Sequence, residues 1–455
     1  MMSKITKRAN ERKPGFIMGT VTHKIAKKLM VTAVIGLTSL NVFAQQGLPA
    51  NWYNLDLKAD GVFGISMEKA YAELLKGKKP KPVIVAVIDG GLDISHEDLQ
   101  GKIWTNSKEI AGNGKDDDKN GYVDDVHGWN FLGSSKESFE YTNDAIVQEV
   151  RKLRVSPDTA KYKSKLAELN DQIKKAVAEK DSLAINYYLN LDYDPRSKNA
   201  KEYAQERFYG NGNVGGNLPP AHGTHVAGII AAVRNNGIGI SGVADAVLLM
   251  PIRTIPDGDA REKDIANAIR YAVDNGASVI NMSFGFSAAA EDAGMVISAV
   301  KYAVSKDVLF ICASGNGNDE MKNAGGYPDR ESDRDKYLTD VFIKVSASGF
   351  ADDANLKVSF SNWSKTTVDV FAPGLGINST IPGNKYEVHS GTSMAAPVVA
   401  GMAAVIRSYY PKLTAKQVKE IIIKSVVKRE PLKEKCITGG VVNAYDALLL
   451  AAEYK

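Results

Sequence analysis

Six short apolar runs recur along the chain, and helical patterns lie between most of them. One of them, Pro82–Ile88 (PVIVAVI), contains no charged or hydrogen-bonding side chain, which is typical of a strand buried on both faces of a parallel sheet. Parallel strands need long crossover connections, which are usually helices. The alternation therefore predicts an α/β fold in three layers, with a mostly parallel sheet between two layers of helices. The other predicted strands are Val247–Pro251, Ser278–Met282, Val308–Ala313, Val341–Val345 and Val368–Ala372. The predicted helices are Met67–Leu75, Arg261–Asn275, Ala288–Ser305, Met394–Tyr409, Thr414–Val426 and Val441–Ala452.

A charged segment from about residue 134 to residue 217 interrupts this alternation. Its Lys- and Glu-rich sequence predicts a helical insertion on the surface, with a first helix at Asp144–Leu153, a break at Pro157 and a second helix after it. A solvated excursion with no role and a lid or partner-binding role are both compatible with this composition. The apolar stripe of the second helix consists of Leu166, Leu169, Ile173 and Val177, spaced three and four residues apart.

The first 44 residues carry the basic character of the chain. They hold eight Lys or Arg and one acidic residue, so the net charge of +4 for the whole chain leaves −3 for the rest. We therefore expect no nucleic-acid partner, which would need a basic patch on the folded part. The basic residues precede an apolar run, Leu29–Phe43, and Ala44 offers a cleavage site before Gln45. This order predicts a signal peptide at residues 1–44 and an exported protein, periplasmic or extracellular; a cytoplasmic protein with a buried N-terminal helix is the alternative.

We expect neither a membrane span nor a disulfide framework in the mature chain. The N-terminal apolar run is shorter than the ~20 residues of a spanning helix, and no later stretch is long and apolar enough. Cysteine occurs only at Cys312 and Cys436, which excludes a Cys-based metal pattern and leaves a bridge between these two open.

Polar residues follow several of the predicted elements, where the carboxyl ends of parallel strands open into a crevice. Asp89 ends the first strand, His222 begins an apolar helical segment, and Ser393 lies where a Gly-Thr turn leads into an Ala-rich helix. Each residue alone is more often a turn former or a helix cap. Together, in this order, they are the parts of a nucleophilic triad, and the helix start supplies N–H groups for an oxyanion. Asn316, after another strand, could add a second donor.

The motifs around these residues are similar to those of a known family. HGTHVAG (222–228) and GTSMAAP (391–397) resemble the His and Ser signatures of the subtilisin-like serine proteases, or subtilases. VAVIDGG (85–91) resembles their Asp signature and ASGN (313–316) their oxyanion segment. The resemblance runs from Pro82 to Leu449, apart from the insertion.

This resemblance implies a subtilisin-like fold and a catalytic domain at residues 81–455, preceded by a lead segment at 45–80. It implies a serine endopeptidase of the peptidase S8 family that acts on protein or peptide substrates, with Asp89, His222 and Ser393 as the triad and Asn316 as oxyanion donor. The residues implied to hold an extended substrate by strand addition are Ser283, Phe284, Gly285, Ala313, Ser314 and Gly315.

Three departures from the family pattern bear on this prediction. Gly90 stands where the family usually has Ser or Thr, so a hydroxyl donor beside Asp89 is lost. Asp89 and His222 are 133 residues apart because of the insertion. The lead segment is too short for the folded inhibitory prodomain of many subtilases. A catalytically impaired, peptide-binding relative is therefore the alternative. An esterase of another fold is disfavoured, because no Gly-x-Ser-x-Gly motif surrounds Ser393.

A separate acidic loop predicts a structural metal. It places oxygen-bearing side chains at positions 1, 3, 5 and 9 of a calcium-type loop, with Gly121 at position 6, but His127 replaces the final Glu. We expect Ca²⁺ here, with a solvated acidic turn as the alternative. We expect no catalytic metal, because His222 and His225 lack the His-Glu-x-x-His spacing and His225 suits a buried structural role. The predicted calcium ligands are Asp116, Asp118, Asn120 and Asp124.

Overall fold

The computed structural model describes residues 48–140, 150, 153–154, 157–179, 207–256, 260–285, 293–321 and 340–454. The predicted signal peptide and nearly all of the first insertion helix, Asp144–Leu153, lie outside them. Within the described part, no helix combines the length and the apolar character that crossing a bilayer requires.

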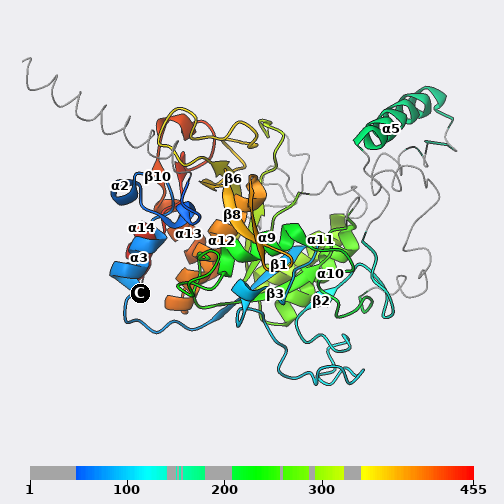
Figure 1. The fold of residues 1–455 in the computed structure, drawn as a ribbon, viewed down its shortest axis with the longest axis horizontal. Coiled ribbons are helices and arrows are strands. Elements are labelled where there is room, and N and C mark those ends of the chain that lie inside the picture. Colours follow the sequence, from blue (N-terminus) through cyan, green and yellow to red (C-terminus); the bar gives the residue numbers. More distant parts are fainter. Residues whose placement is uncertain are drawn as a thin grey trace, which may run out of the picture. The chain divides into compact units, whose positions relative to one another are not determined.

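A sheet of nine strands forms the centre of the fold (Figure 1). Its strand order is β10-β11-β7-β6-β5-β4-β1-β3-β2, and all neighbours are parallel except β10 and β11. The six predicted strands are confirmed, with ends shifted by a few residues. The strands are β1 (Val83–Asp89), β2 (Trp129–Asn130), β3 (Val247–Arg253), β4 (Val279–Met282), β5 (Leu309–Ala313), β6 (Phe342–Ser348), β7 (Val370–Pro373), β10 (Val427–Lys428) and β11 (Gly440–Val441).

The order of the strands places a crevice at the end of β1. From β1 the chain first builds β2 and β3 on one side, then crosses over to β4 and continues through β5, β6 and β7 on the other. Ligands of open parallel sheets bind where the strand order reverses in this way, outside the carboxyl ends of the strands. Asp89 is the last residue of β1 and therefore lies at this point.

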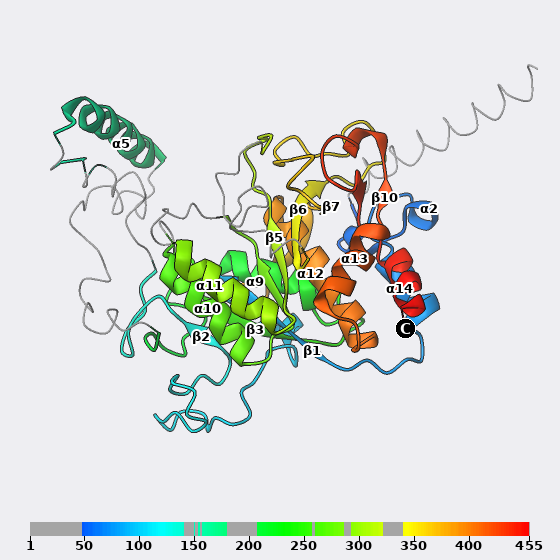
Figure 2. The same cartoon turned by 180° about the vertical axis from the view of Figure 1, so that it is seen from behind.

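Helices cover both faces of the sheet, which confirms the three-layer prediction (Figures 1 and 2). Alternate side chains of β1 point to opposite faces. Ala86 and Ile88 pack with Ile265 and Ile269 of α10, so α10 and its neighbour α11 form one layer. Helices α9 and α12 pack on the other face. Their bounds are α9 (Ala221–Ala231), α10 (Glu262–Asp274), α11 (Ala293–Ser305) and α12 (Thr392–Tyr409).

Shorter elements complete the described part. The prediction for Met67–Leu75 is confirmed as a short α-helix that continues as a π-helical turn. The predicted helix from Val441 begins later, because Val441 pairs with β7 and Asn443 caps the helix by accepting from the Asp446 N–H. A hairpin that the sequence did not predict, β8 with β9, precedes α12. The remaining bounds are α2 (Leu57–Asp60), α3 (Met67–Ala70), η2 (Tyr71–Leu75), α5 (Thr159–Glu179), β8 (Ile377–Ile381), β9 (Lys385–His389), α13 (Ala415–Lys424), α14 (Ala444–Glu453), and the 3₁₀ turns η1 (Trp52–Asn54), η3 (Glu97–Leu99) and η5 (Glu430–Leu432).

Hydrogen bonds join the two ends of the insertion, where the chain leaves the domain and returns to it. The side-chain amide of Asn211 donates to the Ser134 carbonyl, and that of Asn217 donates to the Ser138 carbonyl. The backbone N–H of Asn217 donates to Glu140 Oε1. A long insertion costs little stability when its ends stay this close. In α5 the predicted stripe packs against Val150, except for Val177, which is exposed.

The lead segment packs onto the rest of the domain from residue 50 onward. Trp52 and Tyr53 are buried, and the Tyr53 hydroxyl donates to the Ser241 carbonyl at 2.9 Å. The side-chain amide of Asn54 donates to the same oxygen. These contacts tie the segment to residues more than 180 positions away in the sequence.

Candidate active site

Asp89 and His222 meet at the carboxyl end of the sheet. His222 is the second residue of α9, and its Nδ1 lies 2.8 Å from Asp89 Oδ1 and 3.0 Å from Oδ2. Gly223 allows this approach, because a β-carbon there would collide with the Gly91 carbonyl. Asp89 is buried, whereas the His222 side chain is 47% exposed. The Asp89 charge raises the pKa of His222 above its ordinary value, against the effect of burial.

Ser393 is the second residue of α12, and its hydroxyl donates to the Ser283 carbonyl at 2.8 Å. The Ser283 hydroxyl in turn donates to the Ser393 carbonyl at 2.9 Å. Among the described residues, no hydrogen bond joins Ser393 to His222. The imidazole lines the same cavity as Ser283, whose carbonyl accepts from the Ser393 hydroxyl.

The side-chain amide of Asn316 and the backbone N–H of Ser393 both lie close to Gly391. A β-carbon at Gly391 would lie 3.4 Å from Asn316 Nδ2 and 3.6 Å from the Ser393 nitrogen. The Asn316 carboxamide is oriented through its oxygen, which accepts from the Thr392 N–H and the Thr392 hydroxyl. That hydroxyl also accepts from the Gly315 N–H. Sequence reasoning found Asn316 but missed Thr392, because a Thr before a Ser carries no signal of its own.

The predicted substrate-binding segments lie side by side. Ser283, Phe284 and Gly285 follow β4, whereas Ala313 is the last residue of β5 and Ser314 and Gly315 follow it. Strands β4 and β5 are neighbours in parallel register. The buried Cys312 thiol donates to the Phe284 carbonyl, and burial raises the pKa of this thiol to about 11. Cys436 is also buried, and both thiols are free, so the structure does not contain the bridge that the sequence left open.

The predicted calcium ligands accept backbone hydrogen bonds within the acidic loop. The carboxylate of Asp124 accepts from the N–H groups of Gly112 and Gly114, and that of Asp116 from Asn120 and Gly121. The carboxylate of Asp118 also accepts from the Asn120 N–H, so these bonds do not decide among the predicted ligands, and the set stays a prediction.

A different set of carboxylates converges in the same loop. Oxygens of Glu109, Asp118 and Asp125 lie within 4.8 Å of one another. Glu109 is 9% exposed, and its Oε2 is buried without a hydrogen-bond partner. Burial raises the pKa of Asp125 to about 6, and the nearby Asp118 charge adds to this rise. Asp118 was predicted as a ligand, but Glu109 and Asp125 were not.

His225 lies one turn after His222 and is buried, as predicted. Its Nε2 is 3.0 Å from the Glu387 carbonyl, and its ring stacks on His389 at 4.3 Å between centroids. Burial lowers the pKa of His225 to about 3. His225 is therefore a neutral packing group that supports the hairpin β8–β9 before Ser393.

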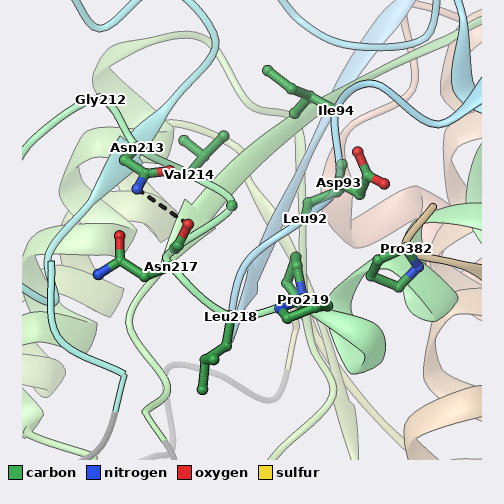
Figure 3. Close-up of a pocket in the computed structure, with 13 residues that line it drawn as sticks. Leu92, Asp93, Ile94, Gly212, Asn213, Val214, Asn217, Leu218, Pro219 and Pro382 are labelled. Atoms are coloured by element: carbon green, nitrogen blue, oxygen red, sulfur yellow. Dashed lines mark hydrogen bonds between the residues drawn. The ribbon is translucent and has the colours of Figure 1, made fainter.

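Two cavities share the wall formed by residues 218–220, which leads into α9. The first, about 480 Å³, is lined in part by Asp89 and His222. The second, about 410 Å³, lies between the loop 212–217 on one side and Leu92, Asp93 and Pro382 on the other (Figure 3). The Asn213 side chain in this second cavity donates to the Gly216 carbonyl and holds the loop in its turn.

The chain is similar in sequence to known proteases. A subtilisin-like protease 1 from Plasmodium vivax is 28% identical over 84% of this chain and 50% of its own length. A thermophilic serine proteinase from a Bacillus species is 41% identical over 41% of this chain and 42% of its own length, and a subtilisin from Bacillus pumilus is 39% identical over 44% and 68%. The chain thus spans about half the length of the first two relatives.

The fold is also found among solved structures. A protease from Pseudoalteromonas arctica superposes with a TM-score of 0.56 and 22% identity, over 89% of this chain and 98% of that one. At this identity the likeness concerns the fold. The profile of the subtilase family matches residues 80–439, which include Asp89, His222 and Ser393. By this match the chain belongs to the subtilase family.

Proposed function

We propose that the chain is an exported serine endopeptidase that hydrolyses peptide bonds through an acyl-enzyme. The observation that carries the proposal is the bond between His222 Nδ1 and Asp89. It fixes the tautomer in which Nδ1 bears the proton and Nε2 is free to act as a base. Ser393 Oγ attacks the scissile carbonyl carbon while Nε2 takes the hydroxyl proton.

The negative charge that develops on the substrate oxygen would lie between Asn316 Nδ2 and the Ser393 N–H, at the helix start. His222 then donates its proton to the amine nitrogen as the C–N bond breaks, which leaves an ester on Ser393. In the second half, water adds to the ester carbonyl while His222 takes one of its protons. The bond from the carbonyl carbon to Oγ then breaks, His222 returns the proton to Oγ, and the carboxylic acid is released. The substrate would lie as an extended strand along residues 283–285 and 313–315.

A fluorophosphonate probe tests this mechanism. The wild-type protein should label at Ser393, and Ser393→Ala should not label. Ser390→Ala removes an exposed hydroxyl three residues away and is the matched control, which should label like the wild type. Hydrolysis of a protein substrate should follow the same pattern. A wild-type protein that neither labels nor cleaves would contradict the proposal.

The second candidate is a catalytically impaired relative that only binds peptides. Two observations favour it: Ser393 donates to Ser283 rather than to His222, and Gly90 supplies no hydroxyl to Asp89. It predicts saturable peptide binding with no labelling and no turnover, so the same probe separates the two candidates.

We also propose a structural Ca²⁺ bound by Glu109, Asp118 and Asp125. Three carboxylates that converge in a partly buried site repel one another unless a cation neutralises them, and an unpartnered Glu109 oxygen suits a calcium ligand. Removing Ca²⁺ with a chelator should lower the Tm of the wild type but not that of Glu109→Gln. Glu97→Gln, an exposed carboxylate, is the control that should retain the Ca²⁺ effect. A wild-type Tm that changes neither with chelator nor with added Ca²⁺ would argue against the site.

Export is proposed from the basic and apolar order of residues 1–44. N-terminal sequencing of the protein recovered outside the cytoplasm should start at Gln45. Recovery of the intact N-terminus from the cytoplasm alone would contradict export.

A further inference from the structure

We propose that Glu140 makes the cavity beside His222 selective for a cationic substrate side chain. This proposal rests on the endopeptidase function proposed above. The position concerned is the residue immediately before the one whose carbonyl is attacked. Glu140 belongs to the charged insertion, so this part of the chain would then take part in substrate choice.

The cavity is continuous with the reacting groups. Asp89, His222 and Ser283 line it together with Glu140 and Arg253, and its volume is about 480 Å³. The remaining wall is apolar and consists of Leu218, Pro219, Pro220, Ala221, Ile255, Pro256 and Phe284.

Strand geometry decides which substrate residue enters this cavity. A substrate extended along residues 283–285 would place the side chain of the attacked residue between that segment and 313–315. Successive side chains of an extended strand point to opposite sides. The preceding residue therefore points away from that pocket, toward the cavity that Phe284 and His222 share.

Two polar contacts hold the Glu140 carboxylate at this cavity. Its Oε2 accepts from Arg253 Nη2 at 2.6 Å, and its Oε1 accepts from the Asn217 N–H at 2.5 Å. The Arg253 side chain is 2% exposed and also donates to the Gly90 and Phe139 carbonyls, whereas the Glu140 side chain is 14% exposed. The carboxylate, not the guanidinium, is thus the charged group more open to an incoming side chain. A carboxylate has about four lone-pair sites, so it can accept further hydrogen bonds.

The charges around the cavity favour a cation. Asp89 and Glu140 are negative and Arg253 is positive, so the net charge is −1 when His222 is neutral, as a general base must be. The apolar wall suits the aliphatic stem of Lys or Arg, whose charged end would reach Glu140. An acidic side chain would meet repulsion from two carboxylates.

The test compares peptide substrates that differ only at this position. Lys and norleucine have stems of similar length, so their ratio of kcat/KM isolates the charge. For the wild type we expect a Lys to norleucine ratio of about fivefold to tenfold, from a partly buried charge-assisted bond, and a Glu peptide slower than both. Glu140→Gln should bring the ratio close to one. Glu137→Gln, an exposed residue of the same loop outside the cavity lining, should keep the wild-type ratio.

The outcomes separate this inference from the proposed function. If the wild type labels with fluorophosphonate and cleaves peptides but prefers norleucine, or shows no preference, the role of Glu140 is wrong and the endopeptidase proposal stands. If it neither labels nor cleaves, both fail. Should Glu140→Gln not fold, the wild-type ratio is measured at low and high salt: it should fall from ~0.05 M to ~0.5 M NaCl, and a ratio insensitive to salt would overturn the charge argument.

Discussion

The Thr392 hydroxyl offers a sharp test of the proposed oxyanion site. Thr392 is 1% exposed, and its Oγ1 donates to Asn316 Oδ1 and accepts from the Gly315 N–H, both at 3.0 Å. Thr392→Val keeps the shape of the side chain and removes both bonds. We expect a loss of about 1–3 kcal/mol in the free energy of unfolding, because the Gly315 N–H is left without its acceptor. Asn316 would keep only the bond from the Thr392 N–H, so we expect kcat to fall about tenfold, or ~1.4 kcal/mol.

A double-mutant cycle separates positioning from general damage. Asn316→Ala alone should lower kcat by about 10²–10³-fold, the range known for a single oxyanion donor in subtilisin. In that background Thr392→Val should cost no further kcat, because Thr392 acts on the reaction through the Asn316 side chain. Thr392→Ser retains the hydroxyl and serves as the control. An equal fall of kcat in both backgrounds would refute the reasoning and assign Thr392 to packing.

Three further predictions concern the groups around Asp89 and His222. In a pH–rate profile, the wild-type kcat/KM should rise with pH as His222 loses its proton, with a pKa held above its ordinary value of ~6.5. Asp89→Asn should move this acidic limb of the profile to lower pH, and kcat should fall. His225→Gln should leave the limb where it is, since burial lowers the pKa of His225 to about 3 and the ring is neutral throughout the working range. Gly90→Ser should change kcat by less than about threefold, because the Gly90 N–H already donates to Asp89 at 2.7 Å; a large gain would show that the missing hydroxyl does limit the enzyme.

The parts of the fold that the sequence predicted are those with a strong local signal. Val83–Asp89 is apolar enough to be identified as a buried strand, and the Ala-rich stretch after Ser393 as a helix. The hairpin β8–β9 was missed because the burial of β9 alternates only weakly and its residues are mostly exposed. Val441 was assigned to a helix because an apolar residue before a helix looks like part of it. Its pairing with β7, 70 positions earlier, and with β10 makes it a strand.

In the candidate site, too, the residues that the sequence predicted belong to local motifs, and those that it missed meet only through folding. Asp89, His222 and Ser393 each belong to a motif, and a motif is local. Glu109 and Asp125 have no such motif, and they meet through the folding of a loop whose regular oxygen spacing favoured other residues. In this loop the carboxylate of Asp124 accepts backbone N–H bonds from Gly112 and Gly114, a contact that the spacing alone does not predict.

The resting contact of Ser393 is too weak to decide between an active and an impaired enzyme. Its hydroxyl donates to the Ser283 carbonyl, and a neutral hydrogen bond of this kind contributes about 0.5–1.5 kcal/mol. Breaking it to face His222 would therefore lower the population of the attacking conformer by about tenfold at most. Serine proteases accelerate hydrolysis by many orders of magnitude, so a tenfold reduction leaves a working enzyme. An extended substrate that pairs with residues 283–285 would also compete for the Ser283 carbonyl, which would release the hydroxyl when peptide is present. Loss of the bond between Asp89 and His222 should lower activity far more than tenfold, because without it the imidazole loses both its orientation and its tautomer.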